Sequence, residues 1–97
     1  MLTLPSTLTH EAAPRFVQGL KPLVQAQPAE VVADAGALRK FDSSALAVLL
    51  ECRREALAAG KTFSVQALPA RLRQLADLYG IAELVPETAT ARIGLAG

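Results

Sequence analysis

The sequence predicts a small α/β domain with a mixed, largely parallel sheet and helices packed on it. Short β-type runs alternate with helical patterns along the chain, the connections are short, and glycine or proline stands at many of the boundaries. The chain has 97 residues, of which 52% are hydrophobic and 20% are charged. This size and composition fit one globular domain with a single core.

The first 26 residues predict a short strand and a bent helix. The run "LTL" at 2–4 is typical of a strand. A helix is expected over residues 10–26, with Thr9 as the N-cap. Pro14 requires this helix to begin nearby, and Pro22 predicts a kink or a helix end. Its apolar face repeats at helical spacing: Phe16, Leu20, Leu23 and Val24.

The middle of the chain predicts a strand, a loop and the longest helix. The run "AEVVADA" at 29–35 is a strand that ends at Gly36. The run "ALRKF" at 37–41 is a loop with two apolar anchors. Residues 43–59 then form a helix that Gly60 stops as its C-cap.

The following segment predicts a strand, a helix and a last short strand. The run "KTFSVQAL" at 61–68 alternates apolar and polar residues, which indicates a half-covered or edge-proximal strand. A helix begins at Pro69 and ends at Gly80. Its apolar face consists of Leu72, Leu75, Ala76 and Tyr79. The run "AELV" at 82–85 is expected to be a strand.

Composition leaves little material for catalysis and favours an interaction module without metal or cofactor. One cysteine and one histidine are too few for a disulfide or a Cys/His zinc site. A net charge of +1 without a basic cluster argues against nucleic-acid binding. No window is apolar enough to span a membrane, and the first residues do not resemble a signal peptide. We therefore expect a cytosolic protein.

The first candidate site is Asp42-Ser43-Ser44, directly before the longest helical run. The first turn of a helix leaves four N–H groups without partners, and Asp or Ser side chains cap them. The simplest interpretation is that Asp42 or Ser43 is a cap and nothing more. The alternative is a switch, because a phosphate on a serine here would lie against the positive helix end and add about two negative charges beside Asp42.

The helix at 43–59 carries more apolar residues than one sheet-facing side requires. At about 100° per residue, one arc is sufficient for the core: Ala45, Val48, Leu49, Cys52 and Ala56. A second arc is separated from the first by Arg53 and contains Leu46, Leu50 and Leu57. These leucines either pack on the next helix or form an exposed partner surface flanked by Arg53, Arg54 and Glu51.

Two other reactive side chains are expected to have no chemical role. Cys52 faces the core arc and is expected to be a small buried hydrophobe. His10 is expected to be a solvated residue near a helix start. A catalytic triad of Ser43, His10 and Asp42 is rejected, because an adjacent Ser and Asp cannot both flank one imidazole and no glycine elbow surrounds the serine.

The segment "VVADAGALRKFDSSALAVLL" resembles the signature of STAS domains, a family named for sulphate transporters and anti-sigma-factor antagonists. Asp34 matches the aspartate at the end of the family's strand. Residues 41–46 match, in order, an apolar residue, Asp, a hydroxyl residue, a small residue, a second small residue that is usually Gly, and Leu. The stretch "LPARLRQLADLYGI" at 68–81 is also similar to this family.

The resemblance covers residues 2–85 and implies a STAS-like fold. We therefore expect a single domain over 1–85, with 86–97 as a C-terminal tail or an added edge strand. Family members usually have a longer N-terminal hairpin, so the resemblance implies a shortened N-terminal strand and an open sheet edge, which is compatible with a homodimer.

Two branches of the family are free-standing domains. In the MlaB-type subunit of the Mla phospholipid-transport ABC system, which maintains outer-membrane lipid asymmetry, the domain binds the ATPase subunit and supports its assembly and activity. In anti-sigma-factor antagonists, a serine kinase phosphorylates the hydroxyl residue and turns binding off. The Ala/Leu-rich helix and "RQLADLYGI" resemble the first branch more closely.

By this resemblance the protein is a non-enzymatic cytosolic subunit that reaches the inner membrane only through its ATPase partner. The phosphorylated antagonist, with a serine kinase and anti-sigma factor as partners, is the alternative. In both branches the site is Ser43 with its neighbours Asp42 and Ser44. The interface candidates are Leu46, Leu50, Arg53, Arg54 and Leu57.

Overall fold

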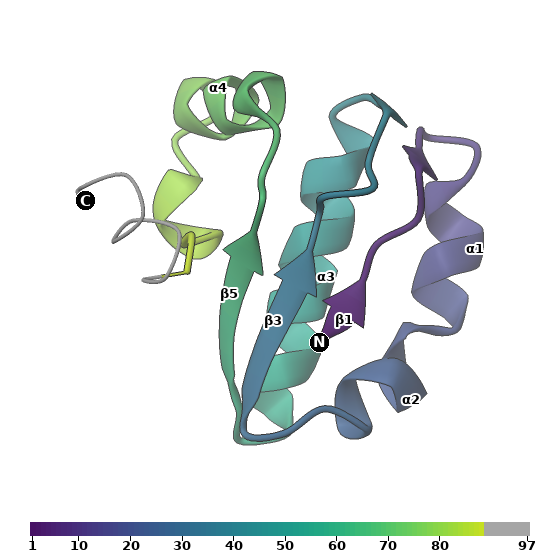
Figure 1. Cartoon of the computed structure of the whole chain (residues 1–97), viewed down its shortest axis with the longest axis vertical. Coiled ribbons are helices and arrows are strands. Elements are labelled where there is room, and N and C mark those ends of the chain that lie inside the picture. Colours follow the sequence, from purple (N-terminus) through teal and green to yellow (C-terminus); the bar gives the residue numbers. More distant parts are fainter. Residues whose placement is uncertain (89–97) are drawn as a thin grey trace.

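The computed structural model, which describes residues 1–88, is built on a three-stranded parallel sheet (Figure 1). Its strands are β1 (Leu2–Thr3), β3 (Glu30–Asp34) and β5 (Thr62–Gln66), in the spatial order β1-β3-β5. A separate parallel pair joins β2 (Thr7–Leu8) to β4 (Lys40–Phe41). The predicted α/β fold with a largely parallel sheet is confirmed.

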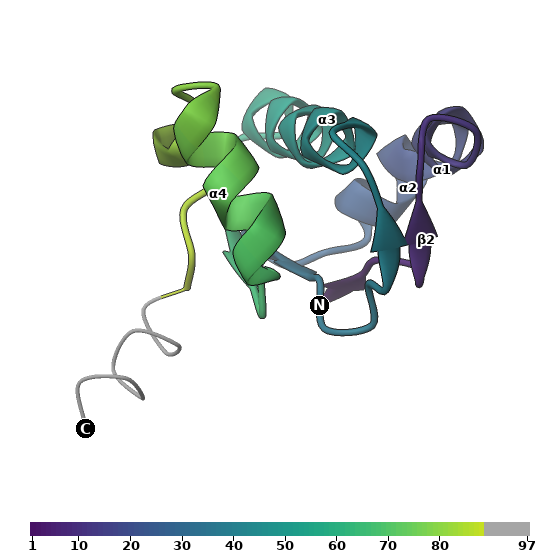
Figure 2. The ribbon, with the colours of Figure 1, turned by 90° about the horizontal axis from the view of Figure 1, so that it is seen from above.

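Four helices accompany these strands within residues 1–88. They are α1 (Ala13–Gln18), α2 (Leu20–Gln25), α3 (Ser44–Ala58) and α4 (Ala70–Leu78). A 3₁₀ turn, η1 (Ala82–Leu84), follows α4. Figure 2 shows α3 between α4 and α1, and Figure 1 shows it running along the sheet.

The sheet buries one face and leaves the other partly open. On β3, Val31 and Ala33 are fully buried, whereas Glu30 is exposed and Val32 is half-buried. This alternation is expected of strands covered by helices on one side only. The first arc of α3 is the main cover, as predicted, because its five residues are all buried: Ala45, Val48, Leu49, Cys52 and Ala56.

Two glycines end the two longest helices as predicted. Gly60 and Gly80 have φ of +74° and +72°, a left-handed conformation that costs glycine little. In each case the next residue donates its N–H back to the last turn. Lys61 bonds the Ala56 carbonyl at 2.8 Å, and Ile81 bonds the Ala76 carbonyl at 2.9 Å.

The segment at 10–26 is two short helices, so the prediction of one bent helix was wrong in detail. The break lies at Gly19, and Pro22 lies in the first turn of α2, where a missing N–H costs nothing. The N-cap position of α1 is Ala12, not Thr9. Pro14 does lie in the first turn of α1, as required. On the predicted apolar face, Leu23 is 44% exposed.

Three further expectations need correction. Residues 40–41 form a strand, not a loop, because the Ser6 carbonyl accepts the N–H groups of Arg39 and Lys40 and draws the two segments together. Residues 82–84 form a 3₁₀ turn in place of the expected strand. Tyr79, placed on the apolar face of its helix, is 55% exposed.

Residues 86–88 lie along the free edge of β5. The Val65 N–H donates to the Pro86 carbonyl at 2.8 Å, and the Thr88 N–H donates to the Val65 carbonyl at 2.9 Å. Glu87 forms an isolated parallel bridge with Val65. Most of the segment expected to be a tail or an added edge strand, residues 89–97, lies outside the described residues.

Candidate functional site at the start of α3

The Asp42 carboxylate caps α3 and also ties it to the segment before α1. Its Oδ1 accepts the Ser44 N–H at 2.8 Å, which satisfies a donor in the first turn of α3. Its Oδ2 accepts the His10 N–H at 3.0 Å, from a residue 32 positions earlier. One side chain therefore fixes both the start of the helix and its position against a neighbouring loop.

These two bonds have an electrostatic consequence. The backbone N–H of Ser44, followed by that of His10, lowers the pKa of Asp42 below its usual value of 3.8. The carboxylate is therefore ionised at neutral pH and holds a fixed negative charge beside the first turn of α3.

Ser43 lies at the N-cap position, but its side chain does not cap the helix. It is exposed, and within residues 1–88 its hydroxyl makes no hydrogen bond. Ser44 is half-buried. Asp42 therefore performs the capping, and the Ser43 hydroxyl remains accessible to another molecule.

The structure brings His10 to this site, which the sequence did not predict. The imidazole Nδ1 lies 3.7 Å from Asp42 Oδ2, and the side chain is 79% exposed. In the described part of the chain no hydrogen bond joins the imidazole to the Ser43 hydroxyl. The arrangement therefore lacks the serine–imidazole contact that a catalytic triad requires.

The segment that leads from β3 to Ser43 makes several polar contacts. Asp34 Oδ1 accepts the Gly36 N–H at 2.9 Å, and a Cβ at position 36 would lie only 3.1 Å from that oxygen. Arg39 donates to the Gly36 carbonyl at 3.0 Å. The Arg71 guanidinium lies 5.9 Å from the centre of the Phe41 ring, which links the start of α4 to β4.

The second arc of α3 is only partly exposed. Leu46 is 2% exposed and belongs to the core together with Leu72 and Ala76 of α4. For Leu46 the alternative of packing on the next helix is therefore correct, and its candidacy for the exposed partner surface was wrong. Leu50 is half-buried against the core. Leu57, at 49%, is the leucine of this arc that solvent reaches freely.

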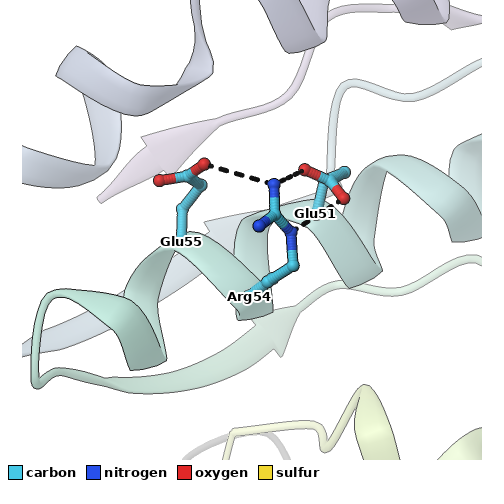
Figure 3. Close-up of polar contacts among 3 residues, drawn as sticks. All are labelled: Glu51, Arg54 and Glu55. Atoms are coloured by element: carbon cyan, nitrogen blue, oxygen red, sulfur yellow. Dashed lines mark hydrogen bonds and ion pairs between the residues drawn. The ribbon is translucent and has the colours of Figure 1, made fainter.

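The two arginines on α3 differ in their surroundings. Arg53 is half-buried and takes part in no ion pair within residues 1–88. Arg54 is held by two acids of its own helix, as Figure 3 shows. It donates to Glu51 at 2.8 and 3.1 Å and lies 3.6 Å from Glu55. The pair lowers the pKa of Glu51 and raises that of Arg54, so a partner's acid would compete with these internal contacts.

Other chemistry is absent from the described residues. Cys52 is buried, and desolvation raises the pKa of its thiol to about 12, so the thiol stays protonated at neutral pH. No three His, Cys, Asp or Glu side chains of residues 1–88 come together as metal ligands. In the same part of the chain, no helix is long and apolar enough to cross a membrane.

Comparison with known proteins identifies the family. A family model described as "Mlab, STAS domain" matches residues 1–86. No curated protein matches the sequence. Among solved structures, a Thermotoga maritima protein provisionally named an anti-sigma factor antagonist has a TM-score of 0.71 at 15% identity, over 94% of this chain and 81% of its own.

A second solved structure shows the same fold. It is a STAS domain protein from Planctomyces limnophilus, described as an anti-sigma-factor antagonist, with a TM-score of 0.72 at 14% identity, over 98% of this chain and 88% of its own. Identities this low establish the shared fold alone. Since the family model spans nearly the whole described structure, the chain belongs to the STAS domain family.

Proposed function

We propose that this protein is a non-enzymatic regulatory subunit that binds the ATPase of an Mla-type phospholipid-transport ABC system on the cytoplasmic side of the inner membrane. The observation that carries the proposal is the free Ser43 hydroxyl at the start of α3. Because Asp42 caps the helix, a partner can contact Ser43 without uncapping it.

Two further features support a binding role over a catalytic one. The family model that matches the chain is described by the MlaB name. Cys52 is buried, Asp42 is held by backbone N–H groups, and within residues 1–88 the exposed His10 imidazole makes no hydrogen bond to the Ser43 hydroxyl. An accessible hydroxyl beside a fixed carboxylate offers hydrogen bonds to a partner but lacks a base to activate it.

The test is a pull-down from native lysate with the tagged domain, followed by ATPase measurements on the recovered complex. We expect an ABC ATPase subunit to co-purify and its ATP hydrolysis to be stimulated by the domain. Ser43→Arg should abolish the stimulation, because the larger cation occupies the contact. Ala58→Arg is the matched control, since it places the same residue at the exposed far end of α3.

Two results would count against the proposal. One is recovery of no ATPase by the wild-type domain. The other is equal stimulation by the Ser43→Arg and wild-type domains, which would place the contact elsewhere.

The second candidate is an anti-sigma-factor antagonist that is switched off by phosphorylation of Ser43. The description of both solved neighbours as anti-sigma-factor antagonists favours it, and an exposed serine at a helix start is accessible to a kinase. Incubation with candidate serine kinases and ATP should then add one phosphoryl group to Ser43, detected by mass spectrometry. Unmodified protein with every kinase that the same genome encodes beside a sigma factor would remove this candidate.

A further inference from the structure

A hollow of about 390 Å³ lies next to the Ser43 site, between the β2–β4 pair and the start of α1. Residues on two of its walls are close in sequence to His10 and Asp42 of the site. Thr9, on its wall, precedes His10, whose N–H bonds Asp42. Lys40, on the opposite strand, lies two residues before Asp42. Its six lining residues are Thr7, Thr9, Glu11, Ala12, Arg15 and Lys40.

The lining of this hollow favours a negatively charged group. Arg15 and Lys40 are exposed, and neither belongs to an ion pair within residues 1–88. Glu11 is the single carboxylate of the lining and pairs with neither cation. Two free cations therefore face one acid, and the hydroxyls of Thr7 and Thr9 add hydrogen-bond donors on the same wall.

We propose that this hollow receives a carboxylate side chain of the partner protein, so that the docking surface around Ser43 selects a partner with an acidic contact. The inference rests on the proposed function, since it assigns the chemistry of the partner at the same end of the domain. A carboxylate fits because an arginine binds it through two parallel N–H groups while a lysine adds a point charge.

A protein partner is favoured over a free anion by the shape and position of the hollow. Thr9 and Glu11 of its lining flank His10, and Lys40 lies two residues before Asp42, so the lining belongs to the two segments that meet at the Ser43 site. A small anion in such an open site would remain largely hydrated and gain little from two exposed cations.

The experiment measures binding of the recovered partner to Arg15→Glu and Lys40→Glu at low and at high salt. Lys21→Glu is the matched control, because it makes the same change in net charge at an exposed helical site that lines a different hollow. We expect each test variant to bind about ten-fold more weakly at low salt, mainly through slower association, with a smaller difference at high salt. Lys21→Glu should bind as the wild type does, and thermal unfolding should show all three variants folded.

A charge exchange identifies the contact on the other side. One Asp→Lys or Glu→Lys variant of the partner should restore its binding to Lys40→Glu.

The outcomes separate this inference from the proposed function. If Ser43→Arg abolishes binding while Arg15→Glu and Lys40→Glu bind as the wild type does, the hollow is not part of the interface, and the proposed function stands. Binding of inorganic phosphate at Arg15 and Lys40, detected by NMR, together with unchanged partner binding, would assign the hollow to a free anion and overturn the proposal. If no ATPase binds the wild-type domain, the proposed function fails and the inference that rests on it fails as well.

Discussion

Lys61 attaches the end of α2 to the sheet, and a single substitution tests how much this contact stabilises the domain. Its Nζ donates to the carbonyl oxygens of Val24 and Gln25, each at 3.0 Å, and to that of Gln27. These carbonyls belong to the end of α2 and the residues that follow it, and that of Val24 also accepts the Gln27 N–H at 3.0 Å. Lys61 directly precedes β5, so the three bonds attach α2 to the sheet.

The substitution Lys61→Met removes the ammonium and keeps a side chain of similar length. The bonds to Val24 and Gln27 are partly buried, whereas the bond to Gln25 is exposed and water can replace it. At about 1.5 kcal/mol for each partly buried bond to a charged group, the free energy of unfolding should fall by about 3 kcal/mol. For a domain of this size that corresponds to a melting temperature lower by roughly 12 to 24 °C.

Urea and thermal unfolding followed by circular dichroism measure this loss. The control is Lys21→Met, because Lys21 is exposed and its ammonium makes no hydrogen bond within the described residues. A loss for Lys61→Met no larger than that for Lys21→Met would show that water replaces all three bonds. The assignment of Lys61 as the cap of α2 would then be wrong.

Three further predictions concern single side chains. Cys52 should resist thiol reagents at mildly alkaline pH in the folded protein and react at once in urea, because burial raises its pKa to about 12. For Asp42, the lowered pKa means that its stabilisation is complete above its usual value of 3.8 and is lost as the pH falls through the folded value. The difference in melting temperature between wild type and Asp42→Asn should therefore shrink on acidification, and a constant difference would contradict the two N–H bonds. Ala67 has φ of +58°, so Ala67→Gly should raise the free energy of unfolding by about 0.5 kcal/mol, whereas Gly80→Ala, at φ of +72°, should lower it by about 1 kcal/mol in urea titrations.

The main elements were predictable because each has a strong local pattern. The helix α3 combines an apolar arc with a terminal glycine, and β3 and β5 are β-type runs next to turn residues. The pair β2–β4 has no such pattern. Two residues on each side are too few to show alternation, and the pairing depends on the Ser6 carbonyl meeting two N–H groups from a loop 33 or more positions later.

The site was predictable in part for the same reason. The cap is a local interaction, and the sequence limited it to Asp42 or Ser43, of which the structure shows Asp42. The approach of His10 to Asp42 and the hollow with Arg15 and Lys40 depend on the position of residues 5–12, which only the tertiary structure shows.

Helical spacing alone could not predict whether Leu46 is buried or exposed. Helical spacing left two places open for the second apolar arc, which are the contact with the next helix and an exposed partner surface. In the structure α4 lies beside α3 and adds Leu72 and Ala76 to the same core. A small domain with a one-sided sheet buries its longest helix on two flanks, so a leucine about 100° from the sheet-facing arc lies in the core.

At the start of α3, Asp42 caps the helix and Ser43 stays accessible. If Ser43 were the cap, its hydroxyl would accept an N–H of the first turn, and a partner or a phosphoryl group would have to displace that bond at a cost of about 1 kcal/mol. Asp42 accepts the Ser44 N–H instead and is itself fixed by His10. Contact or modification at Ser43, as proposed above, would therefore displace no hydrogen bond of the helix start.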